Sequence, residues 1–285
     1  MPVRHIKHES ELGRWEFAFR EPAPLLRSFV EPYTAWTEDI TSFSRRVEMP
    51  YGGLPMIVSF AGPLYLGAPG DDDRSPSPFR DFVAGNHDTY ATSSAHGPQA
   101  GVQVDFRPLG ARMLLGMPLH ELTNQAVTVE DALGPDGRIL AEKLRAAPTW
   151  DACFDLLDAF ITARLATAQP VPEGIAWALA RLRRNDPDTT IGGLADALGV
   201  SHRALIAMFR DYIGLTPRMV ARVARFRRTV ETIDRERPAS LADLAVDCGY
   251  YDQSHLHRDF RQFAGMTPAE YVRRLAPDNG GLIGD

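Results

Sequence analysis

The chain has 285 residues and a formal net charge of −6, with 44% hydrophobic and 24% charged residues. This composition is ordinary for a globular protein, and the length predicts two domains because single cores stop growing near roughly 250 residues. A net negative charge argues against nucleic-acid binding by the chain as a whole. The charge is uneven, however: residues 1–170 hold 15 basic and 22 acidic side chains, whereas residues 171–276 hold 16 arginines and 13 acidic side chains.

The first ten residues and the cysteines argue against several classes of protein. Residues 1–10 are polar and carry no apolar signal core, so we expect no secretion. The longest uncharged run, residues 49–70, contains five glycines and four prolines and predicts strands and turns instead of a membrane helix. Cys153 and Cys248 lack metal-ligand spacing, which argues against a disulfide framework or a four-cysteine zinc site. We therefore expect a cytoplasmic protein with no membrane partner.

The first half of the chain is predicted to be mostly β-structure. Short apolar runs bounded by turn residues are typical of strands, and they occur at 55–60, 64–66, 82–84 and 101–106. Residues 70–78 read as a loop because Asp, Ser and Pro dominate them. We predict an α+β fold in which residues 1–128 form a β-rich domain, either a cupin-like barrel or a sandwich.

Helical periodicity begins near residue 129 and defines a connector over residues 129–170. An amphipathic helix is predicted over residues 149–166, because apolar residues recur there at three- and four-residue spacing between aspartates. Its apolar stripe either pairs two copies of the chain or packs on the chain's own barrel. In the first case the dimerisation contacts are Phe154, Leu157 and Ile161. Residues 169–172, Gln-Pro-Val-Pro, make the best linker.

The C-terminal part of the chain contains an internal repeat. Residues 190–199 match residues 240–249 at an offset of 50, and after the turn the offset becomes 51. Each copy reads as a short helix, a glycine turn, a Ser or Asp cap and a second helix ended by glycine. That order is the helix-turn-helix pattern. The second turn is one residue longer, with Tyr250 and Tyr251 in place of Val200.

Two motifs within the repeat carry a family resemblance. The second copy reads Gly-Tyr-Tyr-Asp-Gln-Ser-His-Leu over residues 249–256 and ends in Gly-Met-Thr-Pro over residues 265–268. With the repeat, these motifs resemble the AraC/XylS family of bacterial transcription regulators over about residues 185–275. In that family one long helix joins the two units, and residues 217–233 fit that role. The order of a β-rich domain, helices and this module is also similar to the family.

The resemblance implies a sequence-specific transcription regulator that binds double-stranded DNA. Residues 171–276 would form an all-α double helix-turn-helix domain in which two reader helices enter successive major-groove segments. We expect Arg203 to bond a guanine bidentately, and Ile206 and Ala207 to contact thymine methyl groups. The candidates from the first reader helix and its cap are Ser201, His202, Arg203, Ile206, Ala207 and Arg210.

The second reader helix is predicted to begin after the cap Asp252. Gln253 suits adenine, and Arg258 suits guanine or phosphate. The candidates that face outward from this helix are Gln253, Ser254, His255, His257, Arg258 and Arg261. Three arginines on the joining helix are expected to contact phosphates, which position a protein without reading sequence, and these are Arg218, Arg222 and Arg225.

The β-rich half is expected to sense an effector or to dimerise. Eight aromatic residues lie within the first 51, and they either pack the core or line a pocket for an apolar or ring-bearing effector. An enzyme would need clustered metal ligands or an activated nucleophile. His87 and His96 lack ligand spacing, and no nucleophile elbow is present. A DNA-repair protein that accepts alkyl groups would need more cysteines. We therefore expect no catalytic residue, metal or cofactor.

The partners that follow are double-stranded DNA, a second copy of the chain and a small effector of unspecified chemistry. RNA polymerase is a further partner if the regulator is an activator. A regulator that answers to a protein partner with no small effector stays open as an alternative. Residues 277–285 are predicted to form a flexible tail.

Overall fold

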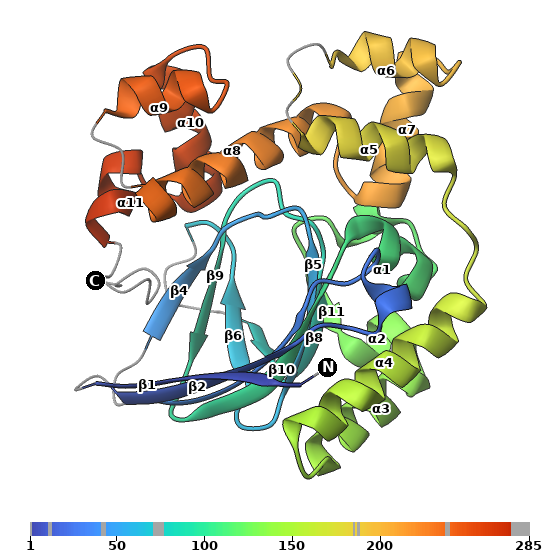
Figure 1. Cartoon of the computed structure of the whole chain (residues 1–285), viewed down its shortest axis with the longest axis vertical. Helices are drawn as coiled ribbons and strands as arrows, with labels where there is room; N and C mark the ends of the chain where they lie inside the picture. The colour runs from blue at the N-terminus through green and yellow to red at the C-terminus, as the bar shows by residue number, and fades with distance from the viewer. Residues whose placement is uncertain are drawn as a thin grey trace.

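The computed structural model describes residues 2–10, 13–40, 44–70, 77–184, 186, 189–236 and 240–274. Its buried apolar side chains form two clusters, one with members from Ala18 to Ile161 and one with members from Ile175 to Tyr271. We call the two parts the N-terminal domain and the C-terminal module, which lies above the barrel in Figure 1. The predicted tail 277–285 and most of the predicted loop 70–78 lie outside the described residues.

Two antiparallel sheets form the barrel of the N-terminal domain. The larger sheet has the strand order β1-β2-β3-β10-β5-β8-β11, and the smaller has the order β4-β9-β6-β7. The strands are β1 (Arg4–Ser10), β2 (Gly13–Arg20), β3 (Tyr33–Ile40), β4 (Ser44–Glu48), β5 (Leu54–Ser59), β6 (Leu64–Gly67), β7 (Ser77–Phe79), β8 (Asp81–Ala84), β9 (Ala91–Ala95), β10 (Gln99–Phe106) and β11 (Ala126–Thr128). The prediction of a β-rich domain followed by helices is confirmed.

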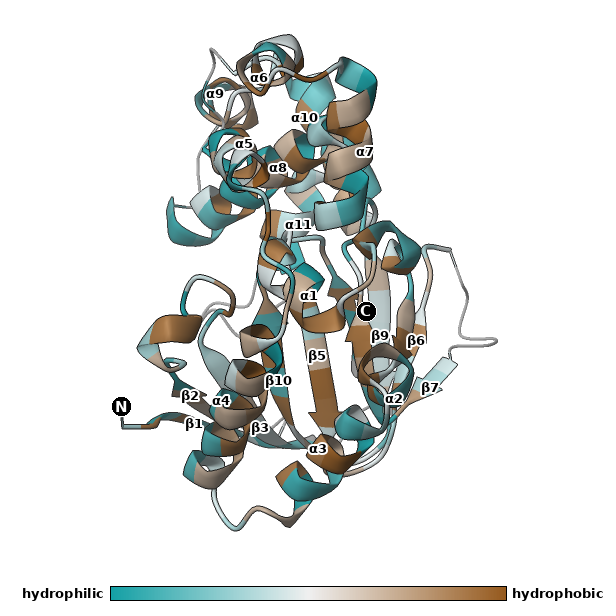
Figure 2. Ribbon diagram, turned by 90° about the vertical axis from the view of Figure 1, so that its right-hand side faces the viewer, coloured by the Kyte–Doolittle hydropathy of each residue, from teal (hydrophilic) through white to brown (hydrophobic). Residues whose placement is uncertain are grey.

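The two faces of the larger sheet have different roles. Successive side chains of a strand point to opposite faces, so alternate residues of β5 separate. Leu54, Met56 and Val58 are buried in the core cluster, opposite residues of β10 that belong to the same cluster. Pro55 and Ile57 line a cavity inside the barrel. Figure 2 shows β5 as hydrophobic over most of its length. The main core therefore lies outside the barrel, under a layer of helices.

That layer follows β10 and carries the chain toward the C-terminal module (Figure 1). Its helices are α1 (Pro108–Leu115), α2 (Val129–Leu133), α3 (Pro135–Ala146) and α4 (Trp150–Ala166), with short 3-10 turns at η1 (Pro24–Leu26) and η2 (Leu119–Leu122). Buried side chains of α2, α3 and α4 belong to the same cluster as the strands. Residues 129–166 thus share the core of the N-terminal domain.

Helix α4 packs on the chain's own barrel. Phe154, Leu157 and Ile161 are at most 1% exposed and belong to the N-terminal core. The prediction that these three side chains form a dimer contact is wrong for this fold, because a side chain that fills its own core cannot also face a second chain. The amphipathic pattern correctly predicted the helix, but it did not decide whether a second chain or the chain's own barrel covers the apolar stripe.

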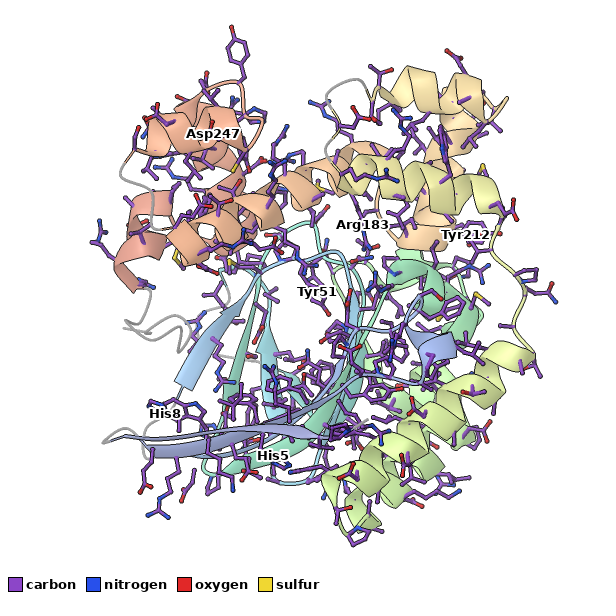
Figure 3. The ribbon with its side chains drawn as sticks, viewed as in Figure 1. His5, His8, Tyr51, Arg183, Tyr212 and Asp247 are labelled. Atoms are coloured by element: carbon purple, nitrogen blue, oxygen red, sulfur yellow. The ribbon has the colours of Figure 1, made fainter. Side chains whose placement is uncertain are left out.

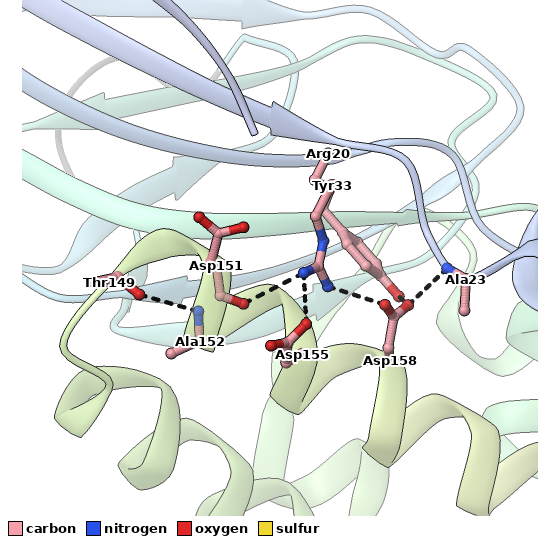
Figure 4. A network of polar contacts seen from close by, with 8 residues as sticks. All are labelled: Arg20, Ala23, Tyr33, Thr149, Asp151, Ala152, Asp155 and Asp158. Carbon is pink, nitrogen blue, oxygen red and sulfur yellow. Dashed lines mark hydrogen bonds and ion pairs between the residues drawn. The ribbon is translucent and has the colours of Figure 1, made fainter. Parts of the chain in front are cut away.

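Polar contacts fix the same helix against β2 and β3 (Figure 4). The side chain of Arg20 is 6% exposed and donates to Asp155 at 2.6 Å and to Asp158 at 2.9 Å. Asp158 also accepts from the hydroxyl of Tyr33 and from the backbone N–H of Ala23. Two of the aspartates that give α4 its polar face therefore form bonds within the domain. These bonds provide partners for the buried guanidinium of Arg20 and the buried hydroxyl of Tyr33.

The C-terminal module is all α. Its helices are α5 (Glu173–Arg183), α6 (Ile191–Ala197), α7 (His202–Ile213), α8 (Pro217–Glu236), α9 (Leu241–Asp247), α10 (Gln253–Ala264) and α11 (Pro268–Arg274). Helix α8 runs between the α6–α7 pair and the α9–α10 pair in Figure 1. The double helix-turn-helix predicted from the repeat is confirmed.

Candidate nucleic-acid interface

The first reader helix, α7, begins at the predicted cap. The hydroxyl of Ser201 accepts from the backbone N–H of Ala204 at 3.1 Å, and the helix ends at Gly214 in the left-handed conformation. Leu205 and Phe209 are fully buried, as the helical period predicts. The predicted candidates all lie on the exposed side of the helix, namely Ser201, His202, Arg203, Ile206, Ala207 and Arg210.

The second reader helix, α10, repeats this arrangement. The carboxylate of Asp252 accepts from the backbone N–H of His255 at 2.7 Å. Gln253, Ser254, Arg258 and Arg261 are exposed, whereas His255 and His257 are half-buried. Partial burial and the neighbouring Arg225 lower the pKa of His255 below its ordinary value. The imidazole of His255 is therefore neutral at pH 7 and can donate one hydrogen bond and accept another.

The three candidate arginines of α8 differ in their surroundings. Arg218 is exposed in the first turn of the helix. Arg222 donates to Asp259 at 2.6 Å, and an Nη atom of Arg225 lies 3.8 Å from the other oxygen of the same carboxylate. The guanidinium of Arg225 also lies over the ring of Tyr250. Arg222 and Arg225 therefore connect α8 to the second helix-turn-helix unit, and their predicted role at phosphates stays a prediction.

Asp259 is a central residue of the module that the sequence reasoning missed. Its side chain is 1% exposed although it carries a carboxylate. A signal was present in the sequence, because position 259 falls three residues after Leu256 and four before Phe263, on the buried stripe of α10. A charged residue on a buried stripe indicates a paired charge, since an unpaired one would be strongly destabilising.

Both reader helices end against the N-terminal domain. At the end of α7, the side-chain amide of Asn86 donates to the carbonyl oxygen of Ile213 at 2.7 Å. The hydroxyl of Thr123 donates to the carbonyl oxygen of Gly214 at 2.6 Å. These bonds satisfy two of the carbonyl groups that the end of a helix leaves without partners.

At the end of α10, the carbonyl oxygen of Gln262 accepts from the hydroxyl of Thr89 at 2.9 Å and from the backbone N–H of Tyr90 at 3.3 Å. The side-chain amide of Gln262 donates to the carbonyl oxygen of Asp88 at 2.7 Å. We call the five residues on the N-terminal side the interdomain clamp, namely Asn86, Asp88, Thr89, Tyr90 and Thr123. The clamp holds the C-terminal ends of both reader helices and leaves the exposed residues at their N-terminal ends uncovered by these contacts.

The barrel encloses a cavity of about 710 Å³. Its wall combines aromatic rings, such as those of Phe17 and Trp36, with amide, hydroxyl and carboxylate groups. Glu38 is buried and pairs with Arg46 at 2.7 Å. His87, which also lines the cavity, has its pKa lowered by burial. The cavity has the size and the mixed lining of a small-molecule site.

Within the part of the chain that the structure describes, no group of three or more His, Cys, Asp or Glu side chains is arranged to hold a metal ion. None of the described helices combines the length and apolar character that crossing a membrane requires.

Two family models match the chain. A helix-turn-helix domain matches residues 194–274, which include both reader helices. A domain of unknown function, DUF6597, matches residues 19–128, which form most of the barrel.

Curated relatives match over a limited segment. A protein of Streptomyces antibioticus named as an AraC-like transcription regulator is 33% identical over 111 residues, which is 39% of this chain and 35% of the relative. A protein of the same name from Streptomyces lividans is 33% identical over 105 residues, or 36% of this chain and 33% of the relative. The chain thus spans about a third of the length of the curated relatives it matches.

Solved structures of ToxT from Vibrio cholerae match most of the chain at low identity. One at 8% identity covers 85% of this chain and 98% of ToxT with a TM-score of 0.48. Another, with unsaturated fatty acid bound, has 11% identity, covers 89% and 96%, and has a TM-score of 0.46. The repeat, its two capped reader helices and the family model meet on the same residues, so residues 194–274 form a helix-turn-helix domain, and the chain is similar over part of its length to AraC-like transcription regulators.

Proposed function

We propose that this chain is a sequence-specific DNA-binding transcription regulator, with α7 and α10 reading two successive segments of the major groove. The observation that carries the proposal is the common placement of the two reader helices. Each is capped at its N-terminus, exposes polar side chains there, and is held at its C-terminus by the interdomain clamp. The width of an exposed α-helix fits the major groove of B-DNA.

The charge of the module predicts how it binds. Sixteen arginines against 13 acidic side chains give residues 171–276 a small positive charge. The pairing of Arg222 and Arg225 with Asp259 lowers the number of cations that are free for phosphates. Weak non-specific binding follows, because that term depends on the number of phosphates a protein neutralises. Useful affinity then requires base contacts and a second copy of the chain on DNA, and we propose a homodimer.

Arg203→Ala is expected to weaken binding to the specific operator by about 1–3 kcal/mol, a typical loss for one bidentate base contact. Arg203 is exposed one residue after the start of α7. The operator is first selected from bound fragments of genomic DNA, and fluorescence anisotropy then measures affinity for it and for a scrambled fragment at one fixed salt concentration.

The matched control is Arg184→Ala, which removes an exposed arginine just after α5 and outside both reader helices. It should leave the ratio of specific to scrambled affinity unchanged. If Arg203→Ala weakened binding to both fragments equally, the side chain would be a phosphate contact. If no fragment were bound above the scrambled one by the wild-type chain, the proposed function itself would be wrong.

We further propose that the barrel cavity binds a small effector. Three clamp residues, Asn86, Thr89 and Tyr90, line this cavity as well as holding the reader helices. An occupant that contacts them changes the free energy of the clamped arrangement, which is the requirement for a ligand to shift a conformational equilibrium. The effector would therefore act on the orientation of α7 and α10.

Trp36→Ala is expected to weaken effector binding at least tenfold, because the indole of Trp36 forms part of the cavity wall. The effector is identified first as the compound in a metabolite set that raises the melting temperature of the wild-type chain. Trp177→Ala is the control, since Trp177 is 41% exposed on α5 and is absent from the cavity lining. No shift with any compound would favour a barrel that only dimerises or answers to a protein partner.

The remaining expectations stay with this proposal. The regulator acts in the cytoplasm by binding DNA and not by catalysis, and it contacts RNA polymerase if it activates transcription. The relatives it resembles carry the name of transcription regulators, which supports this assignment.

A further inference from the structure

A second cavity, of about 350 Å³, lies between the N-terminal domain and the C-terminal module. It is lined from below by residues around Glu31, Tyr51 and Arg107, and from above by α5 and α8. Figure 3 labels one lining residue from each part of the protein, Tyr51 from the N-terminal domain and Arg183 from the C-terminal module. Tyr51 and Asn86 also line the barrel cavity, so the two cavities share part of one wall.

The charged groups of this cavity are unequal in number. Four arginines line it, Arg107, Arg183, Arg227 and Arg228, against two glutamates, Glu31 and Glu231. Arg107 lies 3.1 Å from Glu31, and Arg227 lies 2.8 Å from Glu231, so each glutamate is already paired. Among the described residues, no carboxylate forms an ion pair with Arg183 or Arg228. The lining therefore carries two cationic groups in excess.

Arg183 is the more deeply placed of these two. Its side chain is half-buried at the end of α5, and its guanidinium donates to the carbonyl oxygen of Gly52, a neutral acceptor. Burial, followed by repulsion from Arg107 and Arg227, lowers its pKa. A guanidinium that is partly desolvated beside two others is unfavourable unless an anion lies among them.

We propose that this interdomain cavity binds a small phosphate monoester, with Arg183 and Arg228 contacting the phosphate. A phosphate monoester carries close to two negative charges at neutral pH, which matches the excess in the lining. Guanidinium groups bond phosphate oxygens in pairs, which gives this anion a geometric advantage over a halide. The apolar part of the ligand packs against the uncharged wall, which includes Leu179, Leu215 and Val220.

Such a ligand would contact both parts of the protein at once. Arg183 and Arg228 come from α5 and α8, whereas Glu31 and Arg107 belong to the N-terminal domain. The bound phosphate would hold α8, the helix that joins the two helix-turn-helix units, against the barrel. This site is distinct from the effector site proposed in the barrel, because the linings of the two cavities differ in chemistry. The barrel cavity is lined mostly by aromatic and neutral side chains, whereas the interdomain cavity has an excess of cationic groups.

The test uses phenyl phosphate as the probe and the full chain without DNA, so that its outcome is independent of operator binding. Isothermal titration calorimetry should show one saturable site on the wild-type chain. Arg183→Gln should weaken the probe at least tenfold. Arg184→Gln removes the same charge from the next, exposed residue and should bind as the wild type does.

Two further variants and one further probe separate the remaining outcomes. Arg203→Gln changes the first reader helix and should leave binding of phenyl phosphate unchanged. If this variant lost binding, the anion would lie on the DNA-binding surface and the proposal would be overturned. Arg228 is an exposed residue of the cavity lining. Arg228→Gln should therefore weaken binding of phenyl phosphate, and it tests the site even if Arg183→Gln fails to fold. Equal binding by Arg183→Gln and Arg184→Gln, or tighter binding of glutarate than of phenyl phosphate, would also overturn it.

Discussion

Replacing Asp259 with alanine is expected to lower the free energy of unfolding of the chain by about 3–5 kcal/mol, the usual cost of removing one partner from a buried ion pair. The carboxylate lies 2.6 Å from Arg222 and 3.8 Å from Arg225. The side chains of these arginines are 23% and 17% exposed, so they would be left partly desolvated without a counter-charge. Urea denaturation followed by circular dichroism measures the change.

The matched control is Asp247→Ala. Asp247 is exposed on α9, in the same helix-turn-helix unit, and Figure 3 shows its position. Its loss should change the free energy of unfolding by less than about 0.5 kcal/mol, as is usual for surface positions. Equal urea midpoints for the two alanine variants would contradict a stabilising role for the buried pair. Asp259→Asn, which keeps the shape of the side chain, would show how much of the loss is due to charge.

The contacts of Arg222 also join α8 to the second helix-turn-helix unit. Arg222 donates to Asp259 and to the side-chain oxygen of Gln262, both on α10. Gln262 in turn donates to the clamp at Asp88. A continuous path of polar contacts therefore runs from the joining helix through the second reader helix to the barrel.

Much of the module follows from local sequence signals. The repeat predicts two helix pairs, and the caps Ser201 and Asp252 accept the backbone N–H groups that capping requires. The buried positions Leu205 and Phe209 follow from helical period alone. These features depend on residues close together in the chain, which is why a pattern within one segment is enough to predict them.

Other features depend on partners far away in the chain. The stripe of α4 predicts that Phe154 and Leu157 are buried somewhere, but it is equally consistent with a partner chain and with the barrel. Asp259 pairs with an arginine 37 residues before it, and Gln262 bonds a loop 174 residues before it. Helix and strand periods contain no information about which distant group a polar side chain will meet, so these contacts appear only in the folded chain.

Gly265→Ala is expected to destabilise the full chain by about 2–4 kcal/mol, from two effects. Gly265 has a φ of +68°, and a side chain in this left-handed conformation costs roughly 1–2 kcal/mol. A Cβ atom at this position would also lie 2.8 Å from the ring of Tyr90, a clamp residue, so the ring must move. Thermal and urea unfolding measure the sum of both effects.

Gly199→Ala separates the two effects. Gly199 has a φ of +64°, and no atom lies within 4 Å of a Cβ built there, so this variant carries the backbone strain alone. The difference between the two variants is then the contribution of the contact with Tyr90. Adding Tyr90→Ala to both should abolish that difference, because distant sites add and contacting ones do not. A persistent difference would mean that Gly265 is required for the helix end itself and that the clamp does not bear on α10 through Tyr90. The alternative result has two parts: Tyr90→Ala abolishes the difference in stability, and Gly265→Ala binds the selected operator more weakly than Gly199→Ala does. Together these results would mean that the barrel sets the position of the second reader helix on DNA.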